Sequence, residues 1–179
     1  RQRLRHGLTR GALGAQTTGD DLRRVGSVET GSKDAVIACD NSITHLCGEA
    51  KVLRSFGQCR RSLRQGGVVV FSVRDYATVE RKSPDVSPYG LRSDGDQRAL
   101  AVQVWEWQGD QYDLRIYLTT DAGSACRTEV LHSRYYAVPM ARLLELLSQA
   151  GFVEVTRRDD VFFQPVIHGR KPRCRLNDE

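Results

Sequence analysis

Three polar residues, Asp40, Asn41 and Ser42, follow directly after the apolar run 34–39. A short apolar run between polar segments is typical of a strand that is buried on both faces of a parallel sheet. Open α/β sheets bind their ligands just outside the carboxyl ends of such strands. We therefore predict a ligand site at these residues, although asparagine and serine are equally common as caps of a following helix.

A second polar group, Arg74, Asp75 and Tyr76, follows the apolar run 68–73. The planar guanidinium of arginine binds carboxylates through two parallel hydrogen bonds, and tyrosine commonly lines pockets for amines or hydroxyl compounds. Arg74 and Tyr76 are therefore predicted to bind a substrate at the same edge of the sheet. A structural ion pair between Arg74 and Asp75 is the alternative explanation.

Three further aromatic side chains are candidates for the substrate side of the site. His45 follows the first polar group, and Tyr135 and Tyr136 precede a segment that begins with Pro139. A single histidine is more often packed or exposed than catalytic, and adjacent tyrosines often belong to an aromatic core. We expect these three residues to line the substrate pocket, and we assign no catalytic residue.

The sequence contains no motif for metal-dependent, serine-dependent or phosphate-binding chemistry. It has no metal-ligand spacing, no Gly-x-Ser-x-Gly turn and no glycine-rich loop that ends in Lys-Ser or Lys-Thr. The prediction is therefore a site that works by binding and orienting a small molecule, with no metal.

The segment 34–73 predicts the elements that position the two polar groups. Between the apolar runs, apolar residues recur at helical spacing over 52–64, and the pattern stops at Gly66-Gly67. A strand, a helix and a strand therefore follow one another, which predicts a βαβ unit in a parallel sheet.

The region 77–138 is predicted to be an antiparallel insertion. Its expected segments are a loop over 83–90 and strands over 99–107, 112–119 and 127–137. The turn Gln108-Gly-Asp-Gln111 is a hairpin signal between the first two strands. Trp105 and Trp107 alternate onto one face of this hairpin, and we expect them to pack.

The two ends of the sequence extend the α/β pattern. Residues 1–8 are typical of the last turns of a helix, and residues 11–22 of a short strand. After Pro139 we expect a helix over 140–150, strands over 152–155 and 161–167, and a polar tail over 170–179. The predicted fold is a single α/β domain with a doubly wound, mostly parallel sheet.

The composition is that of a soluble globular protein. No apolar run among the 179 residues reaches the about 20 residues of a membrane helix, which argues against a membrane partner. Five cysteines without a CxxC pair favour reduced thiols in the cytoplasm. The net charge of +5 comes from scattered arginines, which argues against a nucleic-acid partner. Because the sequence begins with Arg1 rather than Met, we expect upstream residues.

The order of the motifs is more specific than any one of them. A run ending Cys-Asp-Asn-Ser, a helix ending Leu-Arg-Gln-Gly-Gly, the strand Val-Val-Val-Phe-Ser-Val-Arg-Asp-Tyr and the segment 143–152 follow one another. In this order they resemble class I S-adenosylmethionine-dependent methyltransferases, most of all the small-molecule branch that includes glycine and sarcosine N-methyltransferases. The resemblance covers residues from about 13 to 168. It implies a Rossmann-like fold that is incomplete at its N-terminus, because no glycine-rich cofactor loop is present.

The resemblance also implies which residues bind the cofactor, S-adenosylmethionine. Beside the adenine it places Asp20, Asp21 and Leu22, and beside the methionine part it places Cys39, Asp40, Asn41 and Ser42. An ordinary turn or a helix cap is the alternative explanation for the Asp-Asp pair.

The implied reaction is methyl transfer to a small-molecule amine or hydroxyl compound, with or without a carboxylate. This in-line displacement depends on the position of the acceptor and needs no metal. Two alternatives stay open: an inactive or binding-only fragment, because the glycine-rich loop is missing, and another nucleotide-dependent α/β enzyme such as a dehydrogenase. The oligomeric state, including a homo-oligomer, is also open.

Overall fold

The computed structural model describes residues 29–121 and 123–173. The predicted helix 1–8, the predicted strand 11–22 and the candidate residues Asp20, Asp21 and Leu22 lie outside this range. In chain order the elements are β1 (Lys33–Ala38), η2 (Ser42–Leu46), α3 (Glu49–Ser62), β2 (Leu63–Ser72), η3 (Tyr76–Thr78), β3 (Asp85–Asp94), β4 (Gln97–Gln108), β5 (Gln111–Asp121), β6 (Cys126–Tyr136), α4 (Met140–Gln149), β7 (Val153–Arg158) and β8 (Val166–Arg170).

The first sheet has the strand order β1-β2-β8-β7. Strands β1 and β2 are parallel and are connected through α3, which confirms the predicted βαβ unit. Strand β8 is antiparallel to both β2 and β7. Among the described strands this sheet is therefore mixed, and the predicted mostly parallel sheet is not seen. The physical reason is that β7 and β8 are joined by a short connection, which permits only antiparallel pairing.

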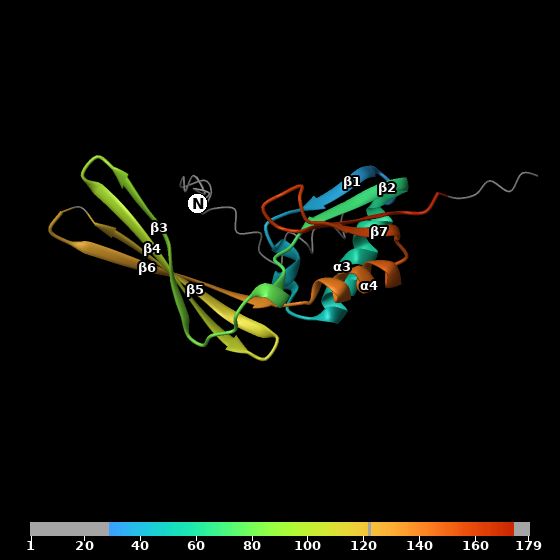
Figure 1. The fold of residues 1–179 in the computed structure, drawn as a ribbon. Coiled ribbons are helices and arrows are strands. Elements are labelled where there is room, and N and C mark those ends of the chain that lie inside the picture. Colours follow the sequence, from blue (N-terminus) through green and yellow to red (C-terminus); the bar gives the residue numbers. More distant parts are fainter. Residues whose placement is uncertain (1–28, 122, 174–179) are drawn as a thin grey trace, which may run out of the picture.

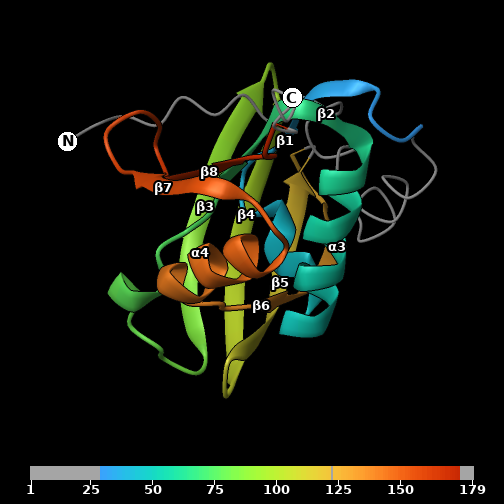
Figure 2. The same cartoon turned by 90° about the vertical axis from the view of Figure 1, so that its right-hand side faces the viewer.

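Helices α3 and α4 pack against each other on one face of this sheet (Figure 1 and Figure 2). The apolar residues of both helices recur every three or four positions, so each helix presents one apolar stripe. The stripes meet β2 and β8 in one core that includes Val52, Phe56, Leu143, Leu147, Phe71 and Ile167. In the described part of the chain no helix covers the opposite face, and Ile37 of β1 is 65% exposed there. The prediction that residues 34–39 are buried on both faces is therefore wrong for the described residues.

The second sheet is an antiparallel meander with the order β3-β4-β5-β6, and it projects from the α/β part (Figure 1). The predicted turn between Gln108 and Gln111 joins β4 to β5, as expected. The predicted loop over 83–90 is wrong, because β3 runs through Pro88 and Gly90. Strand β3 is an edge strand whose register shifts between these two residues, and edges and bulges are where a strand tolerates proline.

Two other boundaries differ from the prediction. Helix α3 ends at Ser62, so Gly66 and Gly67 lie inside β2 rather than at a helix end. At Gly67 a side-chain Cβ would lie 3.0 Å from the backbone oxygen of Asp34, so close strand packing requires this glycine. In contrast, α4 begins after Pro139 and ends next to Ala150, as predicted.

The last predicted strand, 161–167, begins too early. Residues 161–163 belong to the connection between β7 and β8, their side chains are exposed, and β8 begins only at Val166. Their apolar, β-forming side chains predicted a strand, but these residues lie at the tip of the hairpin and are not part of either strand. No helix of the described residues is long and apolar enough to cross a membrane.

Candidate functional site

The structure brings the two predicted polar groups together at one edge of the first sheet. Because β1 and β2 are parallel neighbours, their carboxyl ends lie side by side. The backbone N–H of Asp40 donates to the Ser72 Oγ at 2.8 Å, and the N–H of Asn41 donates to the Ser72 carbonyl oxygen at 3.0 Å. The loops after both strands therefore form one connected surface.

Asn41 connects these loops through its side chain. Its Nδ2 donates to the Tyr76 hydroxyl at 2.5 Å, and its Oδ1 accepts from the Arg74 N–H at 3.1 Å. The side chain is almost fully enclosed, because the residue is only 6% exposed. Asp40 and Asn41 both have left-handed backbones, with φ of 55° and 66°. Adjacent left-handed residues that are not glycine are uncommon and concentrate at functional sites.

The neighbours of these residues differ in exposure. Cys39 is exposed with a free thiol, whereas Ser42 is buried and donates its hydroxyl to the Cys39 carbonyl oxygen. The Asp40 carboxylate is exposed, and the Gln164 Nε2 approaches it at 3.5 Å. Among the described residues of the predicted cofactor group, Asp40 is therefore the one whose charged atoms reach the surface.

An aromatic cluster packs onto the loop after β2. It consists of Tyr76, Trp105, Trp107, Tyr112 and Tyr135. The ring of Tyr112 stacks between Trp105 and Tyr135, with centroid distances of 4.6 Å and 5.1 Å. The Tyr112 hydroxyl lies 3.0 Å from the Tyr76 hydroxyl. The meander thus lays its aromatic face against the carboxyl edge of the first sheet.

The strand register explains this cluster. Trp107, Tyr112 and Tyr135 are directly paired across β4, β5 and β6, so their side chains project from the same face. Trp105 projects from that face too, and its predicted packing role is confirmed. Tyr112 was not among the sequence candidates. The two-residue turn at 109–110 is the signal that would have found it, since that turn pairs Tyr112 with Trp107.

Arg74 contributes a positive charge beside the aromatic cluster. Its guanidinium carbon lies 4.6 Å from the centre of the Trp105 ring, a distance suited to a cation–π contact. Among the residues that the structure describes, no carboxylate forms an ion pair with Arg74. The carboxylate of Asp75 instead pairs with Arg157 at 2.7 Å. The alternative of a structural Arg74–Asp75 pair is therefore not seen, and Arg74 can still receive an anionic group.

Burial keeps three titratable rings of the site, His45, Tyr112 and Tyr135, uncharged near neutral pH. Burial lowers the pKa of His45, whose Nδ1 lies 3.2 Å from the Ser133 hydroxyl and whose ring contacts Tyr135. Burial, together with the neighbouring Tyr76, raises the pKa of Tyr135 to about 12. Burial likewise raises the pKa of Tyr112. The rings therefore offer hydrogen bonds and apolar faces rather than charge.

Tyr136 does not join the aromatic cluster. Successive residues of a strand point to opposite faces, so Tyr136 projects away from Tyr135. Its hydroxyl donates to the Glu49 Oε1 at 3.3 Å, and Arg142 pairs with the same carboxylate at 2.9 Å. The structure thus places four of the five predicted substrate residues, His45, Arg74, Tyr76 and Tyr135, in one contiguous group and leaves Tyr136 outside it.

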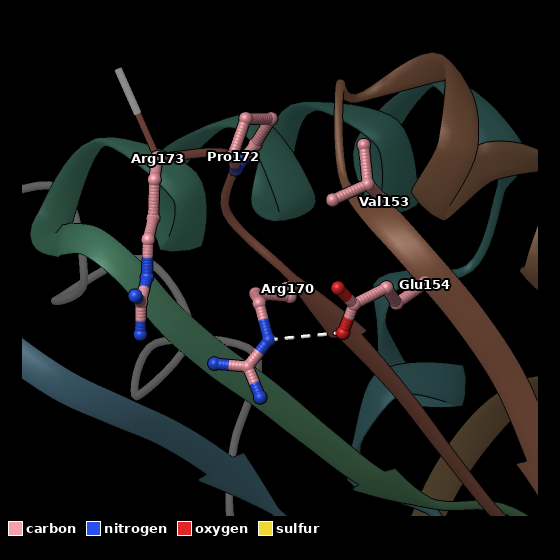
Figure 3. Close-up of a pocket in the computed structure, with 5 residues that line it drawn as sticks. All are labelled: Val153, Glu154, Arg170, Pro172 and Arg173. Atoms are coloured by element: carbon pink, nitrogen blue, oxygen red, sulfur yellow. Dashed lines mark hydrogen bonds and ion pairs between the residues drawn. The ribbon is translucent and has the colours of Figure 1, made fainter. Parts of the chain in front are cut away.

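A hollow of about 480 Å³ lies at the opposite end of the strands, away from the carboxyl ends of β1 and β2. It is lined by Val153, Glu154, Arg170, Pro172 and Arg173 (Figure 3). Arg170 lies at the carboxyl end of β8, which is antiparallel to β2, and donates to the Gly66 carbonyl oxygen at 2.7 Å. The hollow contains none of the predicted site residues. In the described chain no three histidine, cysteine, aspartate or glutamate side chains are grouped so that they could hold a metal ion.

No protein-family model and no curated protein matches the sequence. Solved structures do match. A sugar N-methyltransferase from a Streptoalloteichus species is 18% identical, with a TM-score of 0.66 over 78% of this chain and 56% of that one. An S-adenosylmethionine-bound amino pentose methyltransferase from Micromonospora echinaspora is 13% identical, with a TM-score of 0.68 over 78% and 58%.

A third match is an S-adenosylmethionine-dependent methyltransferase from Clostridium acetobutylicum, which is 11% identical with a TM-score of 0.64 over 92% of this chain and 73% of that one. The chain spans less than two thirds of the length of the first two structures. These similarities do not single out the glycine and sarcosine branch. The chain therefore shares its fold with these methyltransferase structures.

Proposed function

We propose that this protein transfers a methyl group from S-adenosylmethionine to a small-molecule amine or hydroxyl compound. The observation that carries the proposal is the group of Arg74, Tyr76 and the aromatic cluster directly beside Asp40 and Asn41 at the sheet edge. The two solved structures named for sugar N-methyl and amino pentose methyl transfer favour an amine over a hydroxyl as the acceptor group.

The proposed cofactor site has two parts. Its described part is the turn at residues 39–42, where the exposed carboxylate of Asp40 suits the ammonium group of the methionine moiety. The left-handed backbone at Asp40 and Asn41 supports this assignment, because it lifts the turn away from the strand direction. The other part is proposed at Asp20, Asp21 and Leu22, beside the adenine. When bound, the cofactor supplies an electrophilic methyl group.

The residues of the chain bind and orient the acceptor. An amine reacts only through its free lone pair, so the acceptor nitrogen must be uncharged when it meets the methyl group. His45 is held neutral by burial, and the protonated tyrosine hydroxyls donate or accept hydrogen bonds without adding charge. Arg74 pairs with a carboxylate where the acceptor has one. Orientation of the lone pair then supplies much of the rate.

Ligand titration tests the proposal. Trp105 and Trp107 are the two tryptophans of the sequence, and both belong to the aromatic cluster. Intrinsic fluorescence therefore reports on the candidate site, and calorimetry measures the heat of binding. We expect saturable binding of S-adenosylmethionine and none of NAD. A folded chain that binds neither would contradict the proposal in favour of an inactive fragment, and binding of NAD alone would favour a dehydrogenase.

A matched pair of variants locates the cofactor. Asp40→Asn removes the exposed carboxylate at the carboxyl end of β1, and Asp34→Asn removes an exposed carboxylate near the other end of that strand. Loss of a charge-assisted bond of about 1.4 kcal/mol weakens binding roughly tenfold. We expect that loss for Asp40→Asn and wild-type affinity for Asp34→Asn. Equal affinities would exclude Asp40 from the cofactor site.

A further inference from the structure

An ion pair connects the outer strand of the first sheet to the loop of the candidate site. The Arg157 Nη2 on β7 lies 2.7 Å from the Asp75 Oδ2, and the two side chains are 31% and 16% exposed. Strand β8 lies between β7 and β2, so the arginine reaches past one strand to contact the loop that follows β2. The same guanidinium pairs with Asp159 through its Nε at 2.7 Å.

Asp75 uses both oxygens to fix this loop. While Oδ2 binds Arg157, Oδ1 accepts from the Ala77 N–H at 3.1 Å and so starts the short helix η3. Asp75 stands between Arg74 and Tyr76 in the sequence, so the backbone that it holds is the backbone that carries both candidate substrate residues. Tyr76 is only 3% exposed, and Arg74 lies over Trp105.

Stability alone is a weak reason for this ion pair. Partly exposed ion pairs contribute little to folding stability because water screens them and the side chains lose freedom. Arginine is nevertheless well suited to hold two carboxylates at once, since its planar fork presents separate donors to Asp75 and Asp159. Lysine offers a single charged nitrogen on a flexible stem.

We infer that Arg157 is a positioning residue for the acceptor side of the site: through Asp75 it holds Arg74 over Trp105 and Tyr76 against Asn41. The importance of this role for methyl transfer rests on the proposed function. The placement of Arg74 itself is measurable without any acceptor, since Trp105 and Trp107 report on it.

The test compares five single variants and one double variant by tryptophan emission and acrylamide quenching. Arg74→Gln removes the cation from Trp105 and defines the spectral signature of its loss. Arg157→Gln and Asp75→Asn break the ion pair, although asparagine keeps the oxygen that accepts from the Ala77 N–H. Arg158→Gln is the control, because Arg158 is exposed and has no side-chain partner in the described part of the chain, so it loses the same charge elsewhere.

We expect Arg157→Gln and Asp75→Asn to reproduce the Arg74→Gln emission shift in part and to raise the quenching constant about twofold, because a loosened loop opens more often. The double variant Arg157→Gln/Asp75→Asn should show the same emission shift and the same quenching constant as either single variant. Arg158→Gln should match the wild type, and Arg157→Lys should restore part of the signal. Similar urea midpoints for Arg157→Gln and Arg158→Gln would separate positioning from folding.

An Arg157→Gln spectrum equal to that of the wild type, beside a shifted Arg74→Gln spectrum, would overturn the inference. An unchanged Arg74→Gln spectrum would overturn it too, because Arg74 would then not lie over Trp105. These outcomes are independent of methyl transfer. A chain that shows the expected spectra but binds no S-adenosylmethionine would refute the proposed function and leave the positioning role of Arg157 in place.

Discussion

Replacement of Asn41 tests the geometry on which the candidate site depends. Its side chain makes two hydrogen bonds, to Tyr76 and to the Arg74 N–H, inside a nearly closed environment. Each such bond contributes about 1 kcal/mol net. Asn41→Gly removes both while glycine accepts the φ of 66° without strain, so we expect a loss of about 2 kcal/mol in the free energy of unfolding.

Asn41→Ala adds a conformational cost to the same loss. A left-handed backbone costs a residue with a Cβ about 1–2 kcal/mol. Alanine also restricts the unfolded chain more than glycine does, and this offsets about 0.4–1 kcal/mol of that cost. Asn41→Ala should therefore be about 1 kcal/mol less stable than Asn41→Gly, or about 3 kcal/mol below the wild type.

Urea unfolding followed by far-UV circular dichroism measures both losses. Tyr76→Phe, alone and combined with Asn41→Gly, completes a double-mutant cycle for the 2.5 Å bond, and we expect a coupling energy of about 1 kcal/mol. Two results would refute the reasoning. Asn41→Gly within about 0.5 kcal/mol of the wild type would mean that the side-chain bonds are dispensable. An additive cycle would mean that Asn41 and Tyr76 do not interact.

Three other changes follow from single contacts. Gly57→Ala should stabilise the protein by about 1 kcal/mol, because Gly57 lies inside α3 with open space around its Cβ position. Gly67→Ala should destabilise it by about 1–3 kcal/mol, since the new Cβ would press on the Asp34 carbonyl oxygen; thermal melts that reverse this order would contradict the strand packing. The hydrogen-bonded guanidinium of Arg134 lowers the pKa of Asp113. The stability that this carboxylate adds is therefore present above its ordinary pKa near 3.8, and it is lost as the pH falls through the lowered pKa. Asp113→Asn should therefore flatten the loss of stability as the pH falls below about 4, and an unchanged acid titration would speak against the pair.

Much of the fold follows from local patterns in the sequence. The βαβ unit and α4 were predicted because their apolar residues repeat with the period of one element, and Pro139 marks the start of α4. Only the short connection between β7 and β8 indicates their antiparallel pairing, and no local pattern predicts that β8 also pairs with β2. β8 looks like any apolar strand, yet it is inserted antiparallel between β2 and β7. Strand β3 was missed because Pro88 and Gly90 are turn residues in isolation and bulge residues at a sheet edge.

The candidate site was predictable only in part, for a related reason. Asp40, Arg74 and Tyr76 follow apolar strands, and a rule about strand ends finds them. Tyr112 could have been found from the two-residue turn that pairs it with Trp107, whereas Arg157 becomes a neighbour of the site only through contact between distant segments, which no local spacing encodes. The separation of Tyr136 from Tyr135 follows from strand alternation, and it could have been predicted because the expected strand 127–137 already contained both residues.

The position of β8 has a consequence for the making of the protein. Strand β2 acquires its second neighbour only when residues 166–170 exist, about 90 residues after β2 has been synthesised. At a translation rate of about 5–20 residues per second, the side of β2 that pairs with β8 stays unpaired for roughly 5–20 s during synthesis. During that interval a Val-Val-Val-Phe edge is open to other nascent chains. A chaperone that binds extended apolar segments would be most needed at this stage of synthesis.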